Sequence, residues 1–326
     1  MLTKISCYLL VSTLFLCDQA LANDTAVRVS AGGLTFIKNE DIRMTQEILT
    51  ISKEKIRVQY RFLNESNKDI KSTVAFPMPL YTWASGAGFN EGPIESFKVW
   101  ANGKPIKTKS IRKAMIGDRD VTSELRKVGL SDHQIFVSFG QENERPFTKK
   151  QNEKITQLSG ISFNQPRWEV QEMPYWVQNF PKGREISVEH IYKPFLGWIY
   201  TAGEVLEIPT YADLVRPKRE ENEACIDEET KKAIESKAKK VIAGGAKVAR
   251  VTLRDVEYIL GTGRNWKGPI TDFKLRIEKS SADEIISLCF PGKPKKISPL
   301  ILEFSQSNYL PQDKLIIHFY HATPDQ

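Results

Sequence analysis

The sequence predicts a mainly β protein with an antiparallel β-sandwich-like architecture and about three inserted α-helices. Short runs in both halves of the chain alternate apolar and polar residues, which is the period of half-buried strands. Glycine, proline and asparagine separate these runs at the short intervals that turns require. The chain of 326 residues is 40% hydrophobic, so it can bury a substantial core.

The clearest alternation lies in residues 56–63, where isoleucine, valine, tyrosine and phenylalanine share one face and arginine and glutamine share the other. Similar runs at 42–52 and 70–76 flank it, and the three together predict an antiparallel meander. The third run ends at proline. Farther along, Asn102-Gly103 supplies the positive φ angles of a two-residue hairpin turn within residues 97–107.

Helical spacing interrupts the strands in three places. Apolar residues at i, i+4 and i+7 predict a helix over 120–128, and a weaker pattern predicts another over 148–158. The charged segment 212–248 contains an apolar stripe that begins after Asp227, a residue suited to an N-cap. Strand patterns occupy the rest of the second half, at 168–177, 185–192, 251–259, 273–278, 285–290, 300–304 and 315–320.

These patterns suggest four segments. Residues 1–22 form a signal peptide, 23–211 an N-terminal β-rich domain and 212–248 a charged helical insertion. Residues 249–326 form a C-terminal β segment, which we expect to pack with the N-terminal part as one unit.

The N-terminus has the three parts of a signal peptide: a positive charge at Lys4, an apolar stretch over 5–16 and a small-residue end. We expect cleavage between Ala22 and Asn23. The apolar stretch is shorter than the roughly 20 residues of a membrane-spanning helix. The sequence therefore predicts a periplasmic or secreted protein without a transmembrane segment in its mature chain.

The cysteine count agrees with export. Two of the four cysteines lie in the predicted signal peptide, which leaves Cys225 and Cys289 in the mature chain. An even pair in an oxidising compartment predicts a disulfide. It would close a loop of about 64 residues, which contributes on the order of 4 kcal/mol in the chain-entropy model. A redox-active or metal-binding pair is the alternative, but the cysteines lack the close spacing of such motifs.

The net charge of +7 has two interpretations. It favours contact with anionic surfaces such as lipid headgroups or acidic polymers. It is also what a solvated basic face would give, because no block of a single sign exceeds a few residues. We expect no nucleic-acid partner.

No motif in the sequence indicates a catalytic, cofactor or metal site. His318 and His321 are an odd number of residues apart on a predicted strand, so they point to opposite faces. The glycine-rich stretches do not open a helix after a strand, as phosphate-binding loops do. No serine lies in a G-x-S-x-G elbow. We therefore predict no cofactor and assign no catalytic residue.

Tryptophan is the residue type of most interest for ligand binding. The chain has six tryptophans, and most of them are expected to pack in the core or at strand corners. Trp83 is the candidate ligand-contact aromatic, because it lies in a proline- and glycine-rich loop where burial is least assured.

Several separated motifs resemble those of the bacterial domain-of-unknown-function family 4424. They are GLTF at 33–36, AFPMP at 75–79, VEHIYKP at 188–194 and NWKGPI at 265–270. This resemblance implies an exported bacterial protein and no assigned activity, so no catalytic residue can be transferred. Residues 42–110 are also weakly similar to the β-sandwich modules of vault and inter-alpha-trypsin proteins, which would imply a binding or scaffolding module.

Two functions remain open from the sequence. The first is a non-enzymatic binding or structural module of the bacterial envelope, whose partner is an unknown envelope protein or polymer. The second is a hydrolase that acts on envelope polysaccharide or peptide through carboxylates that one sequence cannot identify.

Overall fold

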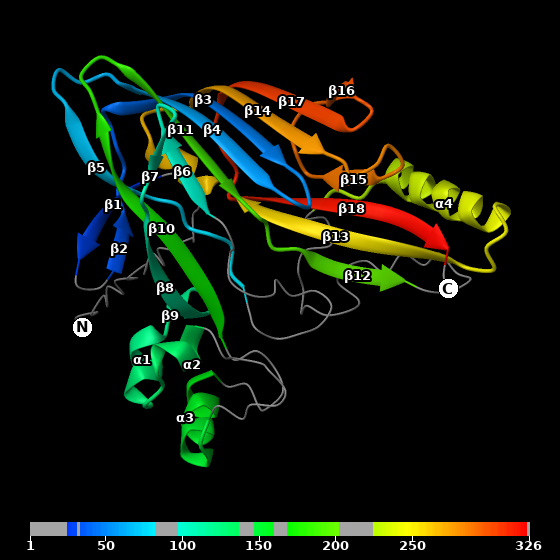
Figure 1. The fold of residues 1–326 in the computed structure, drawn as a ribbon, viewed down its shortest axis with the longest axis horizontal. Coiled ribbons are helices and arrows are strands. Elements are labelled where there is room, and N and C mark those ends of the chain that lie inside the picture. Colours follow the sequence, from blue (N-terminus) through cyan, green and yellow to red (C-terminus); the bar gives the residue numbers. More distant parts are fainter. Residues whose placement is uncertain are drawn as a thin grey trace, which may run out of the picture.

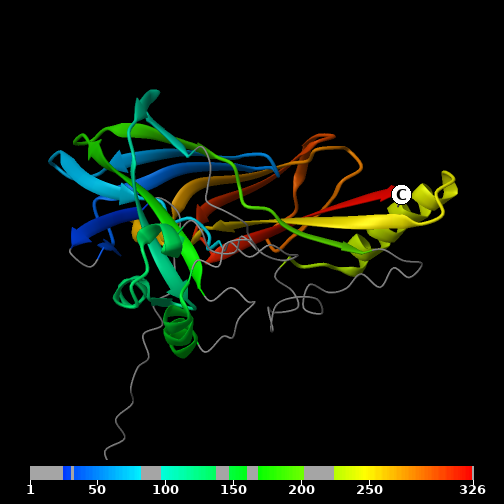
Figure 2. The ribbon, with the colours of Figure 1, turned by 60° about the horizontal axis from the view of Figure 1, so that its bottom comes forward.

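The computed structural model describes residues 25–30, 33–81, 97–136, 147–159, 168–201 and 224–324. The described residues are mostly strands, arranged in three sheets, together with four α-helices. Figure 1 shows strands of the largest sheet lying above two long strands, β13 (Ala249–Ile259) and β18 (Lys314–Pro324), and Figure 2 gives a view turned by 60°. This confirms the predicted mainly β, sandwich-like class, with one helix more than expected.

The largest sheet has eight strands in the order β16-β17-β14-β3-β4-β11-β6-β7. Strands β3 and β14 run parallel, whereas every other pair in the described part of this sheet is antiparallel. The strands are β3 (Ile42–Ile51), β4 (Ile56–Asn64), β6 (Lys98–Ala101), β7 (Lys104–Ile106), β11 (Glu185–Tyr192), β14 (Ile270–Glu278), β16 (Lys295–Ser298) and β17 (Ile301–Tyr309).

The other two sheets are smaller. The six-stranded sheet contains β2 (Gly33–Phe36), β1 (Thr25–Ser30), β5 (Ile70–Ala75), β10 (Glu169–Phe180), β8 (Lys109–Ile116) and β9 (Arg119–Asp120), in that order. The four-stranded sheet contains β12 (Gly197–Thr201), β13 (Ala249–Ile259), β18 (Lys314–Pro324) and β15 (Ile285–Leu288), also in order.

The predicted meander is wrong in its third strand. Strands β3 and β4 pair as expected, but β5 leaves their sheet and pairs with β1 and β10. The intervening turn is tied down by Asn64, whose side-chain amide donates to the carbonyls of Lys68 and Phe180 at 2.8 Å each. Alternation gives the two faces of a strand but not its sheet, so this crossing was not visible in the sequence.

One hydrophobic core joins all three sheets, because the inner face of the eight-stranded sheet packs against the other two. Near its middle, the buried His190 ring lies 5.0 to 5.4 Å from the rings of four aromatic residues. These rings are Tyr60, Phe76, Phe97 and Trp176. The alternation that predicted a strand over 185–192 thus places this histidine in the core.

The helices lie at two ends of the molecule (Figure 1). Helices α1 (Thr122–Lys127), α2 (Asp132–Phe136) and α3 (Lys149–Ser159) surround a second apolar cluster next to β8 and β10. Helix α4 (Glu228–Ala243) packs on β13 and β18 through Ile234 and Ala238. Its N-cap is Asp227, as predicted, and the Asp227 side chain accepts from the Thr230 amide at 2.7 Å.

Cys225 and Cys289 form a disulfide in the structure. It connects the segment that leads into α4 with the end of β15. Beside it, the hydroxyl of Ser287 donates to the carbonyl of Ala224 at 2.6 Å. The disulfide and this hydrogen bond therefore fasten the start of the helical segment to the edge of the four-stranded sheet.

Removing the disulfide should lower the free energy of unfolding. We expect the double variant Cys225→Ala, Cys289→Ala to lose about 2–5 kcal/mol, because the crosslink no longer restricts the unfolded chain. Urea unfolding followed by circular dichroism measures the loss, and reduced wild-type protein is the control. An unchanged midpoint in both samples would contradict this expectation.

Candidate functional site

The outward face of the eight-stranded sheet carries a groove of about 470 Å³ over β3, β4, β11 and the β6-β7 hairpin. Its walls combine one aromatic ring with several amide, guanidinium, hydroxyl and carboxylate groups, a composition suited to an oriented ligand. The lining residues with outward side chains are Gln46, Ile48, Gln59, Arg61, Trp100, Ser187 and Glu189.

The groove follows a row of cross-strand neighbours that runs across the sheet. Each residue of the row is paired in register with the next, from β17 at one side to β7 at the other. With strands about 4.8 Å apart, seven strands span roughly 30 Å. The row consists of Ser305, Lys274, Ile48, Gln59, Glu189, Trp100 and Pro105.

The β6-β7 hairpin presents Trp100 to the groove. Asn102 and Gly103 have φ angles of 47° and 73°, so they form the tight turn that the sequence predicts. Val99 points into the core and is 2% exposed, so its neighbour Trp100 faces outward and is half-buried. The Asn102 side chain also accepts from the Ser187 amide at 2.9 Å, which holds the hairpin against β11.

Glu189, which lines the groove, is paired with Arg57 beside it. Arg57 donates two hydrogen bonds to the Glu189 carboxylate, at 3.1 Å from Nε and 3.0 Å from Nη2. Gln59 adds a third, at 3.3 Å. This fork fixes the carboxylate next to Trp100 and leaves the Arg57 and Glu189 charges mutually neutralised.

A second ion pair borders the groove. Arg61 donates to Glu185 at 2.9 Å, and the Thr45 hydroxyl donates to the same carboxylate at 2.8 Å. The Thr45 hydrogen bond and, after it, that of Arg61 lower the pKa of Glu185, against the opposing effect of burial. Glu185 therefore remains ionised at neutral pH.

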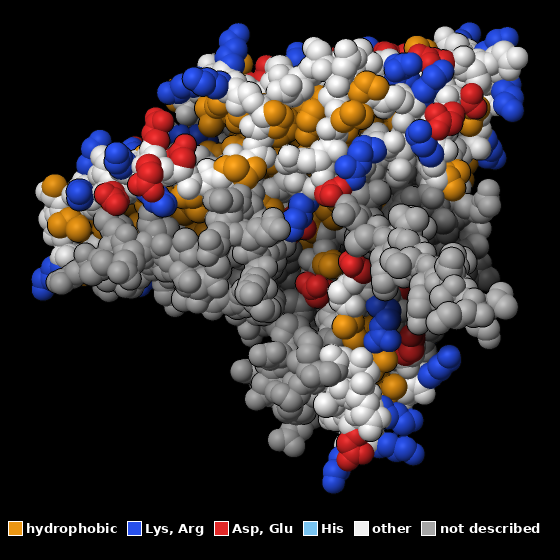
Figure 3. Space-filling view, turned by 180° about the vertical axis from the view of Figure 1, so that it is seen from behind, with side chains coloured by type: hydrophobic (Ala, Val, Ile, Leu, Met, Phe, Trp, Pro, Cys, Tyr) orange, Lys and Arg blue, Asp and Glu red, His pale blue; other side chains and the backbone are white. Residues whose placement is uncertain are grey.

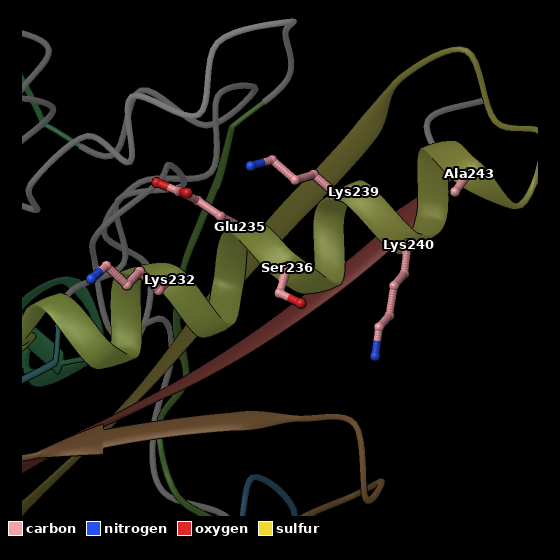
Figure 4. A pocket seen from close by; sticks show the side chains of 6 residues that line it. All are labelled: Lys232, Glu235, Ser236, Lys239, Lys240 and Ala243. Carbon is pink, nitrogen blue, oxygen red and sulfur yellow. The ribbon is translucent and has the colours of Figure 1, made fainter.

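A shallower hollow of about 490 Å³ lies on α4. Its side chains spread apart: Lys240 extends away from Lys232 and Lys239 (Figure 4). Three lysines that diverge do not form a pocket for one anion, so the groove on the sheet is the better candidate site.

The structure describes only some of the residues that were singled out from the sequence. Trp83 and the predicted cleavage site at Ala22 and Asn23 lie outside the described residues. Trp168, Trp176 and Trp266 are at most 3% exposed. Trp100, which lines the groove, was not singled out from the sequence, although its outward position follows from the alternation of the hairpin strand.

The histidines do not meet in one place. His318 is 5% exposed and its Nδ1 lies 3.0 Å from the hydroxyl of Tyr320, whereas His321 is exposed. Within the described ranges, no three histidine, cysteine, aspartate or glutamate side chains gather closely enough to hold a metal ion. In the same part of the chain, no helix is both long and apolar enough to span a membrane.

The fold and the groove define a β-sandwich protein with a mixed polar and aromatic surface on one sheet. The chain belongs to the domain-of-unknown-function family DUF4424, whose model matches residues 22–317. The motifs at 33–36, 75–79, 188–194 and 265–270 thus identified the family correctly.

Two solved structures show distant likeness. A Legionella pneumophila protein described as a candidate nutrient-binding protein has a TM-score of 0.45 and 13% identity, over 92% of this chain and 70% of its own. Yeast LTA4 hydrolase has a TM-score of 0.27 and 10% identity, over 86% and 29% of the respective chains. No curated protein matches the sequence.

We expect the fold to tolerate a change at the Arg57–Glu189 ion pair, because both side chains are partly exposed to solvent. We expect Glu189→Gln to lower the free energy of unfolding by at most about 1 kcal/mol, the usual range for such pairs. The side chains of Arg57 and Glu189 are 42% and 28% exposed. Urea unfolding tests this, with Glu185→Gln as the matched control. A loss above about 2 kcal/mol would show that the fork supports the fold.

Proposed function

We propose that this chain is an exported protein of the bacterial envelope, periplasmic or secreted, that binds a ligand without transforming it. The N-terminal residues have the composition of a signal peptide. The Cys225–Cys289 disulfide supports export as well, because such bonds persist mainly in oxidising compartments.

The ligand that we propose is a polyhydroxylated polymer, an envelope glycan. Trp100 is the observation that carries this proposal, because an indole face in a polar groove can cover the apolar face of a sugar ring. Around it, Gln46, Gln59 and Ser187 offer amide and hydroxyl groups to sugar hydroxyls. Groups that both donate and accept suit hydroxyls, which also do both.

The row of outward residues favours a polymer over a single sugar. It extends from Ser305 to Pro105 across seven strands, roughly 30 Å. The arginines in and beside the groove are matched by carboxylates, in the pairs Arg57–Glu189 and Arg61–Glu185. Lys274 is the one residue of the row with a cationic side chain in no ion pair of the described residues, so a neutral or weakly charged chain fits this surface better than a polyanion, which would need more unmatched cations.

Binding fits the groove better than hydrolysis. Glycoside hydrolysis usually needs two carboxyl groups about 5–9.5 Å apart, one on each side of the scissile bond. Glu185 and Glu189 point to the same face of β11, but four residues of strand separate their backbones by roughly 13 Å. Both carboxylates are also held by arginine.

Trp100→Ala should abolish or strongly weaken glycan binding. The variant removes the ring that covers the sugar face and leaves the paired charges in place, so we expect affinity to fall at least about tenfold. Co-sedimentation with purified peptidoglycan sacculi, followed by titration with soluble glycan chains cut from them, measures the effect.

Lys104→Ala is the matched control for Trp100→Ala. Lys104 lies on the same hairpin opposite Ala101, outside the groove lining, and its loss should leave binding unchanged. Two results would refute the glycan proposal: no binding of wild-type protein to sacculi or glycan chains, or equal binding by the Trp100→Ala variant.

Export has its own test. We expect the protein isolated from the periplasm or medium of an expressing bacterium to begin at Asn23, because the small residues before it suit signal peptidase. N-terminal sequencing determines the first residue. Retention of the full-length chain in the cytoplasm would contradict export without bearing on what the groove binds.

A further inference from the structure

The hairpin of β16 and β17 forms an unusual edge of the eight-stranded sheet. β16 is the last strand on its side, and residues 291–297 are all exposed. They include Lys293, Lys295 and Lys296. In the view from behind, lysine and arginine side chains gather over this hairpin with hydrophobic side chains beside them (Figure 3, upper left).

Protection of the sheet edge explains only part of this composition. Lysine and proline on an edge strand prevent pairing with other chains. Ile297 and Leu300, however, are 47% and 41% exposed, and exposed apolar side chains on an edge strand favour association with other chains. The register shifts between Lys296 and Ser298, so Ile297 sits at an irregularity of the ladder. Exposed apolar residues next to lysines indicate a partner that accepts both.

The lysines of neighbouring elements extend the same positive region. The amide of Lys279 donates to the carbonyl of Leu300 at 2.8 Å, which places the end of β14 beside the hairpin. Burial lowers the pKa of Lys279, and the nearby ammonium groups of Lys296 and Lys237 lower it further, against Glu284. Lys279, just after β14, therefore lies within electrostatic reach of Lys296 on β16 and Lys237 on α4.

Two acidic groups of this region are already paired. Asp283 forms an ion pair with Lys237, and the buried Glu284 forms one with Lys53. The lysines of the hairpin have no such match among the ion pairs of the described residues, so their charge faces solvent. We call Lys279, Lys293, Lys295, Lys296, Ile297 and Leu300 together the basic edge.

We propose that the basic edge docks the protein onto an anionic lipid bilayer. Isoleucine and leucine enter the boundary between headgroups and acyl chains, while the lysines contact the negative headgroups around them. A soluble polyanion would use the lysines and leave Ile297 and Leu300 in water. An apolar protein surface would bury those two side chains but gain nothing from the lysines.

This inference does not depend on glycan binding. The basic edge lies at the β16 side of the sheet, and Trp100 lies on β6, near the opposite side. Six strand spacings, roughly 30 Å, separate the two strands. Variants of one surface therefore leave the other intact.

Vesicle binding tests the proposal with the full mature chain. Vesicles of phosphatidylcholine with phosphatidylglycerol supply the anionic surface, and vesicles of phosphatidylcholine alone supply the neutral one. We expect co-sedimentation with the anionic vesicles only, weakened by high salt. The triple variant Lys293→Glu, Lys295→Glu, Lys296→Glu should bind at least about tenfold more weakly, since each lysine near the surface contributes.

A matched variant shows whether binding depends on the charge of the basic edge or only on the net charge of the protein. Lys104→Glu, Lys107→Glu, Lys109→Glu changes the net charge equally but lies on exposed positions of β7, of β8 and of the link between them, and it should bind as wild type does. Ile297→Ser, Leu300→Ser should weaken binding even at low salt. Circular dichroism checks that each variant is folded. Equal binding to neutral and anionic vesicles, no binding at all, or equal loss in the matched variant would overturn the proposal.

Discussion

The parallel pairing of β3 with β14 is the interaction on which the arrangement of the sheets depends. It brings together strands far apart in the sequence: the Gln46 side chain donates to Asp272, 226 residues away, at 2.8 Å. Through it, the antiparallel pair of β14 and β17 extends the sheet that β3 and β4 begin. Without this pair, the eight-stranded sheet would divide into two smaller sheets, and the core beneath it would lose its continuous cover.

This constraint explains which parts of the fold could be predicted from the sequence. The β6-β7 hairpin and the cap of α4 are local: Asn102-Gly103 and Asp227 act on neighbouring backbone groups, and both were found. The sheet to which β5 belongs is decided by contacts with β1 and β10. Long-range pairing of this kind leaves no periodic signal, so the predicted meander failed there.

At the candidate site, too, the sequence predicts what depends on neighbouring residues but not what depends on distant strands. The outward direction of Trp100 is a local property, because its neighbour Val99 faces the core. Its surroundings are not local, since Glu189 and Arg57 come from two other strands, 132 residues apart. Loop composition directed attention to Trp83 instead, because a loop tryptophan is identifiable from its neighbours alone. A tryptophan on a strand can be recognised as a candidate binding residue only when its neighbours on the adjacent strands are known.

The two proposed surfaces lie on the same sheet, one over its central strands and the other at its β16 edge. A central groove requires paired neighbours on both sides to hold its polar groups, as Glu189 is held between Gln59 and Trp100. An edge offers the opposite: few neighbours, exposed side chains and no competing partner on its outer side. Contact with a bilayer at β16 would therefore leave the middle of the sheet uncovered. The groove near β6 would then remain open to a polymer at a fixed distance from the membrane.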